Sequence, residues 1–387
     1  MVQSTGGDQP SFTLGIEEEY FLVDAHTRAL ASELPRQLLH ECRTVLGEHV
    51  SAEYQRSQIE VSTPVCTSTS EARAALAHSR KVVAGVARGY GLLPIAASTH
   101  PFASWATQRH THKDRYNKIA QELQAVGRRM VTNGLHIHVG IEDDAHRIAI
   151  MNEIRGFLPL LLALSTSSPF WQGEDTGLKS YRTAINDATP RNGIPDYFEN
   201  WNEYHRAVTT LVHSGVIEDA TKVWWDLRPS SRFATLELRI TDICPLIDDA
   251  LCIAAVFRCL CRCLYRRSQR GLRMPNYPLL LLNENRWRAQ RYGLECGFID
   301  PSRQAIIASA ALLDDLLRII REDAVYFDCG AEVNHVHVIL ARGTSADRQL
   351  ALYHQQGNCA RALHTVVDKL IVETAGDTPK IASASAR

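Results

Sequence analysis

Seven ionisable residues stand inside short apolar segments whose composition is typical of β-strands. They are the acids Glu17, Glu19, Glu60 and Glu237, the histidines His136 and His138, and Arg239. In a strand, side chains two residues apart point to the same face of the sheet. Positions 17 and 19, positions 136 and 138, and positions 237 and 239 therefore each share one face of a predicted strand.

Each strand taken alone has a simpler interpretation, because an acid on an exposed sheet face is common. An isolated H-x-H pair is likewise more often half-exposed than metal-binding. The joint pattern favours a site: if these strands adjoin in one antiparallel sheet, one face collects carboxylates, imidazoles and a guanidinium. Burying carboxylates without partners is costly, and divalent cations arriving with phosphate would compensate the charge.

The predicted donor set indicates phosphoryl transfer. Hard oxygen ligands suit Mg2+ or Mn2+ better than zinc, and the cysteines are not interleaved with these acids. Metal ions that bridge carboxylates and a triphosphate neutralise charge during phosphoryl transfer, and an arginine stabilises the transferred group. A phosphorylated carboxylic acid can then be attacked by an amine.

The elements that must position these residues are strands separated by helices and long loops. We expect strands at residues 14–23, 58–63, 92–98, 134–141 and 235–243 and helices at 71–89, 145–164, 197–213 and 248–271, with a mostly helical last third. Ser68 and Glu71 have capping-box spacing before the first of these helices. The segment 165–225 is rich in Gly, Pro, Asn and Trp, and loops this long are usually functional. The usual glycine-rich nucleotide motifs and the G-x-S-x-G motif are missing from the sequence.

Composition excludes several kinds of partner. The 387 residues carry 42 Lys+Arg and 43 Asp+Glu, and a polyanion binder usually has a basic surplus, so we expect no nucleic-acid partner. The apolar stretch 156–173 contains Pro159, Pro169 and four hydroxyl residues, which predicts a buried helix end followed by a loop and no membrane partner. The N-terminus has neither a basic start nor an apolar core, so we expect a cytoplasmic protein with ten reduced, structural cysteines.

Eight segments, in order from residue 14 to about residue 293, resemble the YbdK-type carboxylate–amine ligases, also called glutamate–cysteine ligase type 2. They are GIEEEYFLVD, SQIEVSTPVC, ASTHPFASW, NGLHIHVGIED, SPFWQGEDTGLKSYR, WWDLRPS, TLELRITDICPLIDDA and ENRWRAQRYG. The resemblance implies an α+β fold like the glutamine synthetase catalytic domain. In that fold a curved antiparallel sheet has helices packed on its outer face and binds ATP and divalent metals on its concave face. We expect one ligase domain at 12–375, a flexible leader at 1–11 and a flexible tail at 376–387.

The same resemblance implies the reaction and the roles of the residues. ATP-dependent joining of the glutamate γ-carboxylate to the cysteine amine passes through γ-glutamyl phosphate and releases ADP and phosphate. The implied metal ligands are Glu17, Glu19, Glu60, Glu237 and His136, with His138 as second choice. The implied catalytic residue is Arg239, at the γ-phosphate and then the acyl phosphate, with Arg182 and Arg228 as further candidates for ATP or substrate binding. Glu18 should point to the opposite face.

Several alternatives stay open from the sequence. Arg228 has a second interpretation as a cap of the loop after Trp225, and the tryptophans 171, 224 and 225 are more often core than substrate platform. The histidines 335 and 337 are more often structural than metal-binding, and the polar loop 100–116 is a candidate lid. The competing functions are a ligase of the same chemistry acting on another acid or amine, a metal-dependent hydrolase, and a binder without turnover. The resemblance favours a homodimer, with apolar residues at 308–320 available for an interface.

Overall fold

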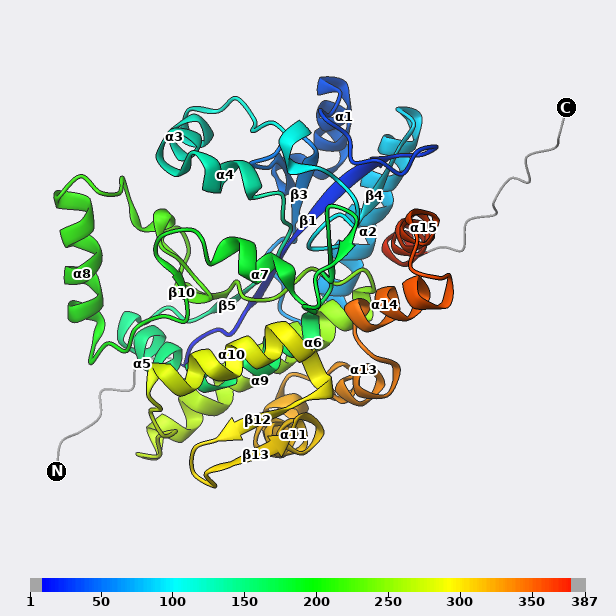
Figure 1. The fold of residues 1–387 in the computed structure, drawn as a ribbon. Coiled ribbons are helices and arrows are strands. Elements are labelled where there is room, and N and C mark those ends of the chain that lie inside the picture. Colours follow the sequence, from blue (N-terminus) through cyan, green and yellow to red (C-terminus); the bar gives the residue numbers. More distant parts are fainter. Residues whose placement is uncertain (1–8, 377–387) are drawn as a thin grey trace, which may run out of the picture.

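The centre of the fold is a seven-stranded, entirely antiparallel sheet (Figure 1). The computed structural model describes residues 9–376, so residues 1–8 of the predicted leader and 377–387 of the predicted tail lie outside the described residues. The strands run in the order β10-β11-β5-β1-β3-β2, and β4 also pairs with β1. Their bounds are β1 Leu14–Asp24, β2 Val50–Ala52, β3 Gln58–Ser62, β4 Leu92–Ile95, β5 Leu135–Gly140, β10 Leu227–Pro229 and β11 Thr235–Leu238.

Strand β1 organises the sheet because it pairs with three other strands. It lies between β3 on one side and β5 followed by β4 on the other, and Phe21 is opposite both Gln58 and Ile95. One face of β1 is apolar and completely buried, through Leu14, Ile16, Tyr20 and Leu22 in particular. The alternating sequence of this strand therefore separates an apolar face from the face that carries positions 17 and 19.

Helices cover the apolar face of the sheet. They are chiefly α1 (Arg36–Leu46), α2 (Thr69–Gly89), α5 (Asp144–Ile154) and α9 (Ile247–Gln269), whose buried side chains join those of the sheet in one core cluster. Helix α9 is apolar on nearly all sides and is buried from Asp249 to Leu264, as expected for a central helix. Ser68 caps α2 by accepting a hydrogen bond from the Glu71 N–H, while the Glu71 carboxylate accepts one from the Thr67 N–H. This arrangement gives the predicted α+β architecture, with a helix layer behind the sheet.

The other elements surround this two-layer centre. The remaining helices are α3 Asp114–Leu123, α4 Ala125–Arg129, α6 Leu158–Ser165, α7 Tyr181–Asn186, α8 Trp201–His213, α10 Leu279–Tyr292, α11 Ser309–Tyr326, α12 Gly330–Asn334, α13 Val336–Arg342, α14 Ser345–Gln355 and α15 Ala360–Ala375. Short strands occur at β6 Phe170–Trp171, β7 Glu174–Asp175, β8 Asn192–Gly193, β9 Trp224–Trp225, β12 Gly297–Asp300 and β13 Ala305–Ala308. In Figure 1, α3 and α4 lie above the sheet, α8 stands apart at the left, and α10 crosses below α7.

Within residues 9–376, one helical segment is long and apolar enough to cross a membrane, judged by length and composition alone. It comprises residues Asp144–Ser165, and 78% of its apolar window is buried within the protein. The stretch predicted as a buried helix end followed by a loop corresponds to α6, in which every residue is buried, and the loop after it. That prediction is confirmed, and the segment is a core helix of the fold.

Several predicted elements are shorter in the structure, among them the strands 92–98 and 235–243 and the helix 197–213, which cover 92–95, 235–238 and 201–213. The predicted strand 235–243 ends at Leu238, because the next two N–H groups, of Arg239 and Ile240, both donate to the carbonyl of Asp226. Because both N–H groups bond to this one carbonyl, the backbone after Leu238 leaves the hydrogen-bond pattern of the sheet. The segment 334–340 is helical, in keeping with the mostly helical last third that the sequence predicts. All ten cysteines are free and only Cys359 is exposed, so their interpretation as structural thiols holds.

A buried ion pair joins the apolar face of β1 to the helix layer. Glu18 points away from positions 17 and 19, as predicted, and its carboxylate accepts from Arg80 Nε at 2.9 Å and Nη2 at 2.5 Å. Both side chains are at most 2% exposed. Arg80 also donates to the carbonyls of Cys244 and Pro245, and the hydroxyl of Tyr20 donates to Glu18. Removing one member of such a pair leaves an uncompensated buried charge.

We therefore predict that Arg80→Met lowers the free energy of unfolding by about 3–5 kcal/mol, since it strands the Glu18 carboxylate in the core. The double variant Glu18→Gln/Arg80→Met should lose less, because no charge remains buried. Chemical denaturation of the three proteins measures both differences. A single variant as stable as the wild-type protein would contradict the assignment.

Candidate active site

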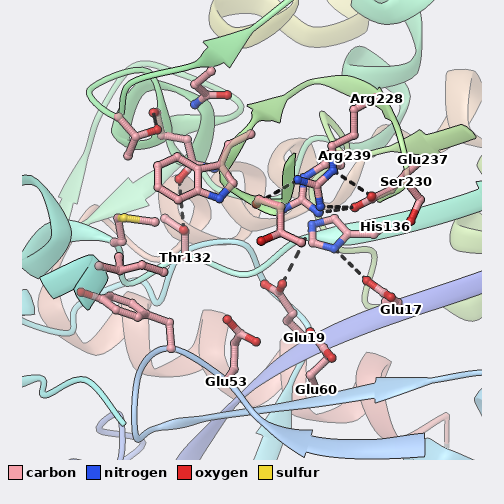
Figure 2. Close-up of a pocket in the computed structure, with 18 of the residues that line it drawn as sticks. Glu17, Glu19, Glu53, Glu60, Thr132, His136, Arg228, Ser230, Glu237 and Arg239 are labelled. Atoms are coloured by element: carbon pink, nitrogen blue, oxygen red, sulfur yellow. Dashed lines mark hydrogen bonds and ion pairs between the residues drawn. The ribbon is translucent and has the colours of Figure 1, made fainter. Parts of the chain in front are cut away.

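The residues predicted from strand alternation gather on one face of the sheet (Figure 2). The strand register places Glu19 opposite Glu60, Glu17 opposite His136, and Glu237 opposite both His138 and Arg228. Side chains directly opposite in an antiparallel pair are close neighbours on the same face. The expectation that these strands adjoin and share one ionisable face is therefore met by the geometry.

One group of donors on this face consists of Glu17, His138 and Glu237. Their ligand atoms all lie within 4.8 Å of one another. His138 Nδ1 bonds the hydroxyl of Thr235 at 2.9 Å, and its Nε2 lies 3.4 Å from a Glu17 oxygen. That Nε2 is buried and has no hydrogen-bond partner within residues 9–376. A nitrogen oriented by a bond at the other ring atom, and left without a partner itself, fits a metal ligand.

Charge in this group is compensated by neighbouring side chains. Burial raises the pKa of Glu17, but the adjacent imidazoles of His136 and His138 outweigh burial and hold that pKa well below its usual range. Burial also raises the pKa of Glu237, but the adjacent Arg239 and Arg228 outweigh burial and hold that pKa well below the ordinary value. Both carboxylates are therefore ionised at neutral pH.

A second group consists of Glu19, Glu53 and Glu60, whose ligand atoms also lie within 4.8 Å of one another. Figure 2 shows Glu53 facing the other two from the opposite side. Burial, and then the charge of Glu53, raise the pKa of Glu19 to about 8. Burial and Glu53 likewise raise the pKa of Glu60 well above its ordinary value. Arg182 and Arg239 act against this rise at Glu19 but do not outweigh burial and Glu53. Three carboxylates in contact under these conditions form a site that takes up either protons or a divalent metal.

Glu53 is the member that strand alternation missed. It follows directly after the last residue of β2, in an irregular segment, so no period of two marks it. The only available indication was its position seven residues before Glu60 in a polar stretch that leads into a predicted strand.

His136 lies between the two groups. Its Nδ1 is 3.2 Å from a Glu17 oxygen and its Nε2 is 4.0 Å from a Glu19 oxygen, as the dashed lines in Figure 2 show. Burial and the nearby Arg239 lower the pKa of His136 to about 4, so the imidazole is neutral and able to bind a cation. The sequence ranked His136 ahead of His138, whereas in the structure His138 belongs to the first group and His136 connects the two.

The three predicted arginines all line the cleft but differ in availability. Arg239 contacts Glu237 and retains 21% side-chain exposure toward the cleft. Arg228 binds Glu237 with two nitrogens, at 2.9 and 3.2 Å, and also donates to the Val223 and Thr221 carbonyls. Arg228 thus lines the cleft and also holds the segment before Trp225, whereas the sequence interpretation placed its cap on the loop after Trp225.

Arg182 lies beside Gly134, directly before the first residue of β5. It donates to the carbonyls of Arg239 and Ile240, each at 3.0 Å. A Cβ atom at position 134 would lie 2.7 Å from Arg182 Nη2 and 2.9 Å from His136 Nε2, so a larger residue here would displace these side chains. The Gly134 N–H in turn donates to Glu19 at 2.7 Å. Close packing at a glycine therefore brings Arg182, His136 and Glu19 together.

The ionisable face forms the floor of a cleft of about 510 Å³. Lys113, Arg115 and Tyr116 line it from one side, Trp224 from another, and Arg232 with Phe233 from the β10–β11 turn. A concave site of this size with convergent polar groups is typical of small-molecule binding. The donor set of carboxylates and imidazoles, in two groups of three, fits Mg2+ or Mn2+.

Other candidates from the sequence lie elsewhere. His100 is buried, its Nε2 donates to the Arg28 carbonyl, and its Nδ1 accepts two backbone N–H groups. His335 pairs with Asp249 in the helical last third, which supports its structural interpretation. Trp225 packs against Phe198 and Tyr204, so of the three tryptophans only Trp224 is among the described cleft-lining residues.

Solved structures with the same architecture define the class of fold. A glutamate–cysteine ligase from Francisella tularensis, solved in complex with AMP, aligns over 95% of this chain and 93% of its own with a TM-score of 0.67 at 12% identity. A bifunctional glutathione synthetase from Pasteurella multocida aligns over 94% of this chain and 52% of its own with a TM-score of 0.69 at 14% identity. The α+β fold with its large antiparallel sheet is therefore the fold of glutamate–cysteine ligases.

Sequence comparison identifies the family within that class. The profile of glutamate–cysteine ligase family 2 matches residues 13–365. The chain is 53% identical over 374 residues to the "Putative glutamate–cysteine ligase 2" of Rhodospirillum rubrum, covering 95% of this chain and 96% of the relative. It is 48% identical over 364 residues to the protein of the same name from Jannaschia sp., covering 93% and 96%. The chain belongs to glutamate–cysteine ligase family 2, and the predicted resemblance is confirmed.

The raised pKa of Glu19 generates a prediction for the metal-free protein. A carboxyl whose pKa is about 8 in the fold and 4.5 ordinarily stabilises the fold below pH 4.5. That contribution is lost as the pH rises toward 8, because the folded state then binds more protons than the unfolded state. The free energy of unfolding should therefore fall between pH 5 and pH 8. Glu19→Gln should reduce that slope, as measured by denaturation at several pH values.

Saturating Mn2+ provides the matched condition for this experiment. A divalent cation replaces the proton between the carboxylates, so it should restore stability at pH 8 in the wild-type protein. An unchanged slope in the Glu19→Gln variant would show that Glu19 is not the group that titrates.

Proposed function

We propose that the protein is an ATP-dependent ligase that joins the γ-carboxylate of glutamate to the amine of cysteine, with ADP and phosphate as the other products. Family membership and the names of relatives at about half identity support this proposal. The AMP complex of the Francisella tularensis structure supports nucleotide use. The observation that carries the proposal is the pair of three-donor groups beside Arg239 on the floor of one cleft.

Two sets of residues would hold divalent metals in this proposal. One consists of Glu17, His138 and Glu237, the other of Glu19, Glu53 and Glu60, and His136 can join either. Bound Mg2+ or Mn2+ would neutralise the triphosphate during phosphoryl transfer. The raised pKa of Glu19 and Glu60 supports the second set, because the positive charges near these carboxylates do not outweigh burial and the charge of Glu53.

The residues of the chain would act mainly by position and charge. A γ-carboxylate oxygen of glutamate attacks the terminal phosphorus of ATP, the bond to ADP breaks, and γ-glutamyl phosphate forms. The amine then attacks the acyl carbon and phosphate leaves. Arg239, fixed by Glu237, would contact the transferred phosphoryl group in both steps. Arg182 and Arg228 are further candidates for phosphate or substrate-carboxylate binding, and walls around the cleft would limit hydrolysis of the acyl phosphate.

A ligase with the same chemistry and another acid or amine is the second candidate. The cleft volume of about 510 Å³ leaves room for substrates other than glutamate and cysteine, which supports keeping this candidate. A panel of acids and amines, scored by ADP release, separates the two. A metal-dependent hydrolase would turn over without ATP, and a binder would release no ADP with any pair.

A cytoplasmic location and a homodimer also remain proposals. Ten free cysteines are in keeping with a reducing compartment. Helix α11 turns its apolar residues Leu313, Leu316 and Ile320 inward, so residues 308–320 offer less exposed apolar surface than the sequence suggested. The large exposed apolar side chains of this region are instead Ile306, just before α11, and Val325 and Tyr326 at its end. Sedimentation of the purified protein tests the oligomeric state.

The ligase proposal predicts ADP release that requires an acid, an amine and Mg2+ or Mn2+ together. Arg239→Ala should lower kcat by about 10³-fold or more, because an arginine on a transferring phosphoryl group contributes that much. Arg206→Ala, on the exposed face of α8, serves as the control and should keep wild-type activity. Full activity in Arg239→Ala would overturn the assigned role of Arg239.

The segment 100–116, which the sequence predicts as a candidate lid, divides in the structure into a part that lines the cleft and a part that is fixed in the core. Lys113, Arg115 and Tyr116 line the cleft, whereas His100 is already fixed in the core. With an ATP analogue, glutamate and Mg2+, hydrogen exchange should slow at residues 111–116 and stay unchanged at 100–103. Exchange that is unaffected by these ligands at 111–116 would count against a lid.

A further inference from the structure

The guanidinium of Arg286 joins two carboxylates from separate segments of the chain. Arg286 lies on the buried side of α10 and is 7% exposed. Its Nη1 and Nη2 each donate to Asp187 at 2.8 Å, while Nε and Nη2 donate to Asp226 at 2.6 and 3.2 Å. All three nitrogens are thus engaged by protein carboxylates, although the residue borders the cleft. Arg286 therefore holds protein groups in place.

Asp226 links Arg286 to Arg239, because it is hydrogen-bonded to both. It stands between β9 and β10 and is 4% exposed. Its carbonyl accepts the N–H groups of both Arg239, at 2.8 Å, and Ile240, at 3.0 Å, and its own N–H donates to Gly193. The side chain of this residue is bound by Arg286 and its carbonyl binds the backbone at Arg239. The position of the Arg239 backbone therefore depends on how firmly Asp226 is held.

Asp187 forms the second arm of the network. It follows the last residue of α7, the helix that carries Arg182. Arg182 donates to the carbonyls of Arg239 and Ile240, so the same short segment is held from both sides. Gln290, one turn after Arg286 on α10, donates to Asp187 at 3.1 Å. Helix α10 thus fixes both supports of the segment that presents Arg239.

We propose that Arg286 is a positioning residue of the ligase reaction, which fixes the backbone at Arg239 through Asp226 and the α7 end through Asp187. This inference rests on the proposed function, because Arg239 is the group assigned there to the transferred phosphate. The planar guanidinium can bind two carboxylates at once, a geometry that the single ammonium of lysine does not reproduce. Small displacements of a group that acts in the transition state are costly, about 10²-fold for roughly 1 Å.

The kinetic test uses Arg286→Gln and Arg286→Lys, with Arg266→Gln as the matched control. Arg266 on α9 binds Asp323 and Glu322 in a comparable cluster and does not belong to the described lining of the cleft. Both Arg286 variants should lower kcat by about 10–100-fold while the KM for ATP stays within about twofold. Arg266→Gln should keep its kcat, although it also lowers the melting temperature. Equal loss of kcat in the control would overturn the positioning role.

Hydrogen exchange provides a readout that does not depend on turnover. The Arg239 and Ile240 amides donate to Asp226, so they should exchange faster in Arg286→Gln and at the wild-type rate in Arg266→Gln. Asp226→Asn weakens the same tether, should show the same increase, and replaces Arg286→Gln if that variant does not fold. Unchanged exchange at these amides overturns the inference whatever the kinetics show. A wild-type protein that releases no ADP with any acid and amine overturns the proposed function, and the exchange result still decides the role of Arg286.

Discussion

Crowding of carboxylates on one buried face of a sheet is the constraint on which the rest of the structure depends. Glu17, Glu19, Glu53, Glu60 and Glu237 share the floor of one cleft. Like charges at these distances repel unless a cation, a proton or a hydrogen bond intervenes. The two halves of the face meet this constraint differently. Glu237 receives two arginines, whereas burial and mutual repulsion prevail in the group around Glu53, where Glu19 and Glu60 hold protons more tightly.

Because of this difference, the two halves of the face suit different ligands. In the proposed reaction the arginine-rich half is suited to the phosphate groups, and the half with raised pKa values is suited to taking up a divalent cation. His136 lies between the halves and is neutral because burial and Arg239 lower its pKa to about 4. A neutral imidazole can bind a metal cation held by either half of the face, and it adds no positive charge of its own.

Strand β1 makes the arrangement possible because one of its faces lines the cleft and the other packs against the helix layer. Positions 17 and 19 point into the cleft, and Glu18 points into the helix layer, where Arg80 compensates it. The same eleven residues therefore anchor the core and supply the site. The support reaches further, since α10 holds Asp187 and Asp226, which in turn hold the segment around Arg239. A helix late in the chain thus stabilises a site built mostly by earlier strands.

The sequence by itself determined which side chains share a face, because alternation along a strand is a local property of the backbone. It paired Glu17 with Glu19, His136 with His138, and Glu237 with Arg239 on single strand faces and sent Glu18 to the opposite face. The family resemblance predicted the α+β class, and the sheet order then brought the strand faces onto one surface. Only the tertiary structure decided that Glu53 completes the second group and that His138, rather than His136, completes the first. It also decided that Arg286 reaches Asp226 across 60 residues of sequence. These contacts depend on strand register, loop path and helix packing, which are set by interactions between distant segments and leave no periodic pattern in the chain.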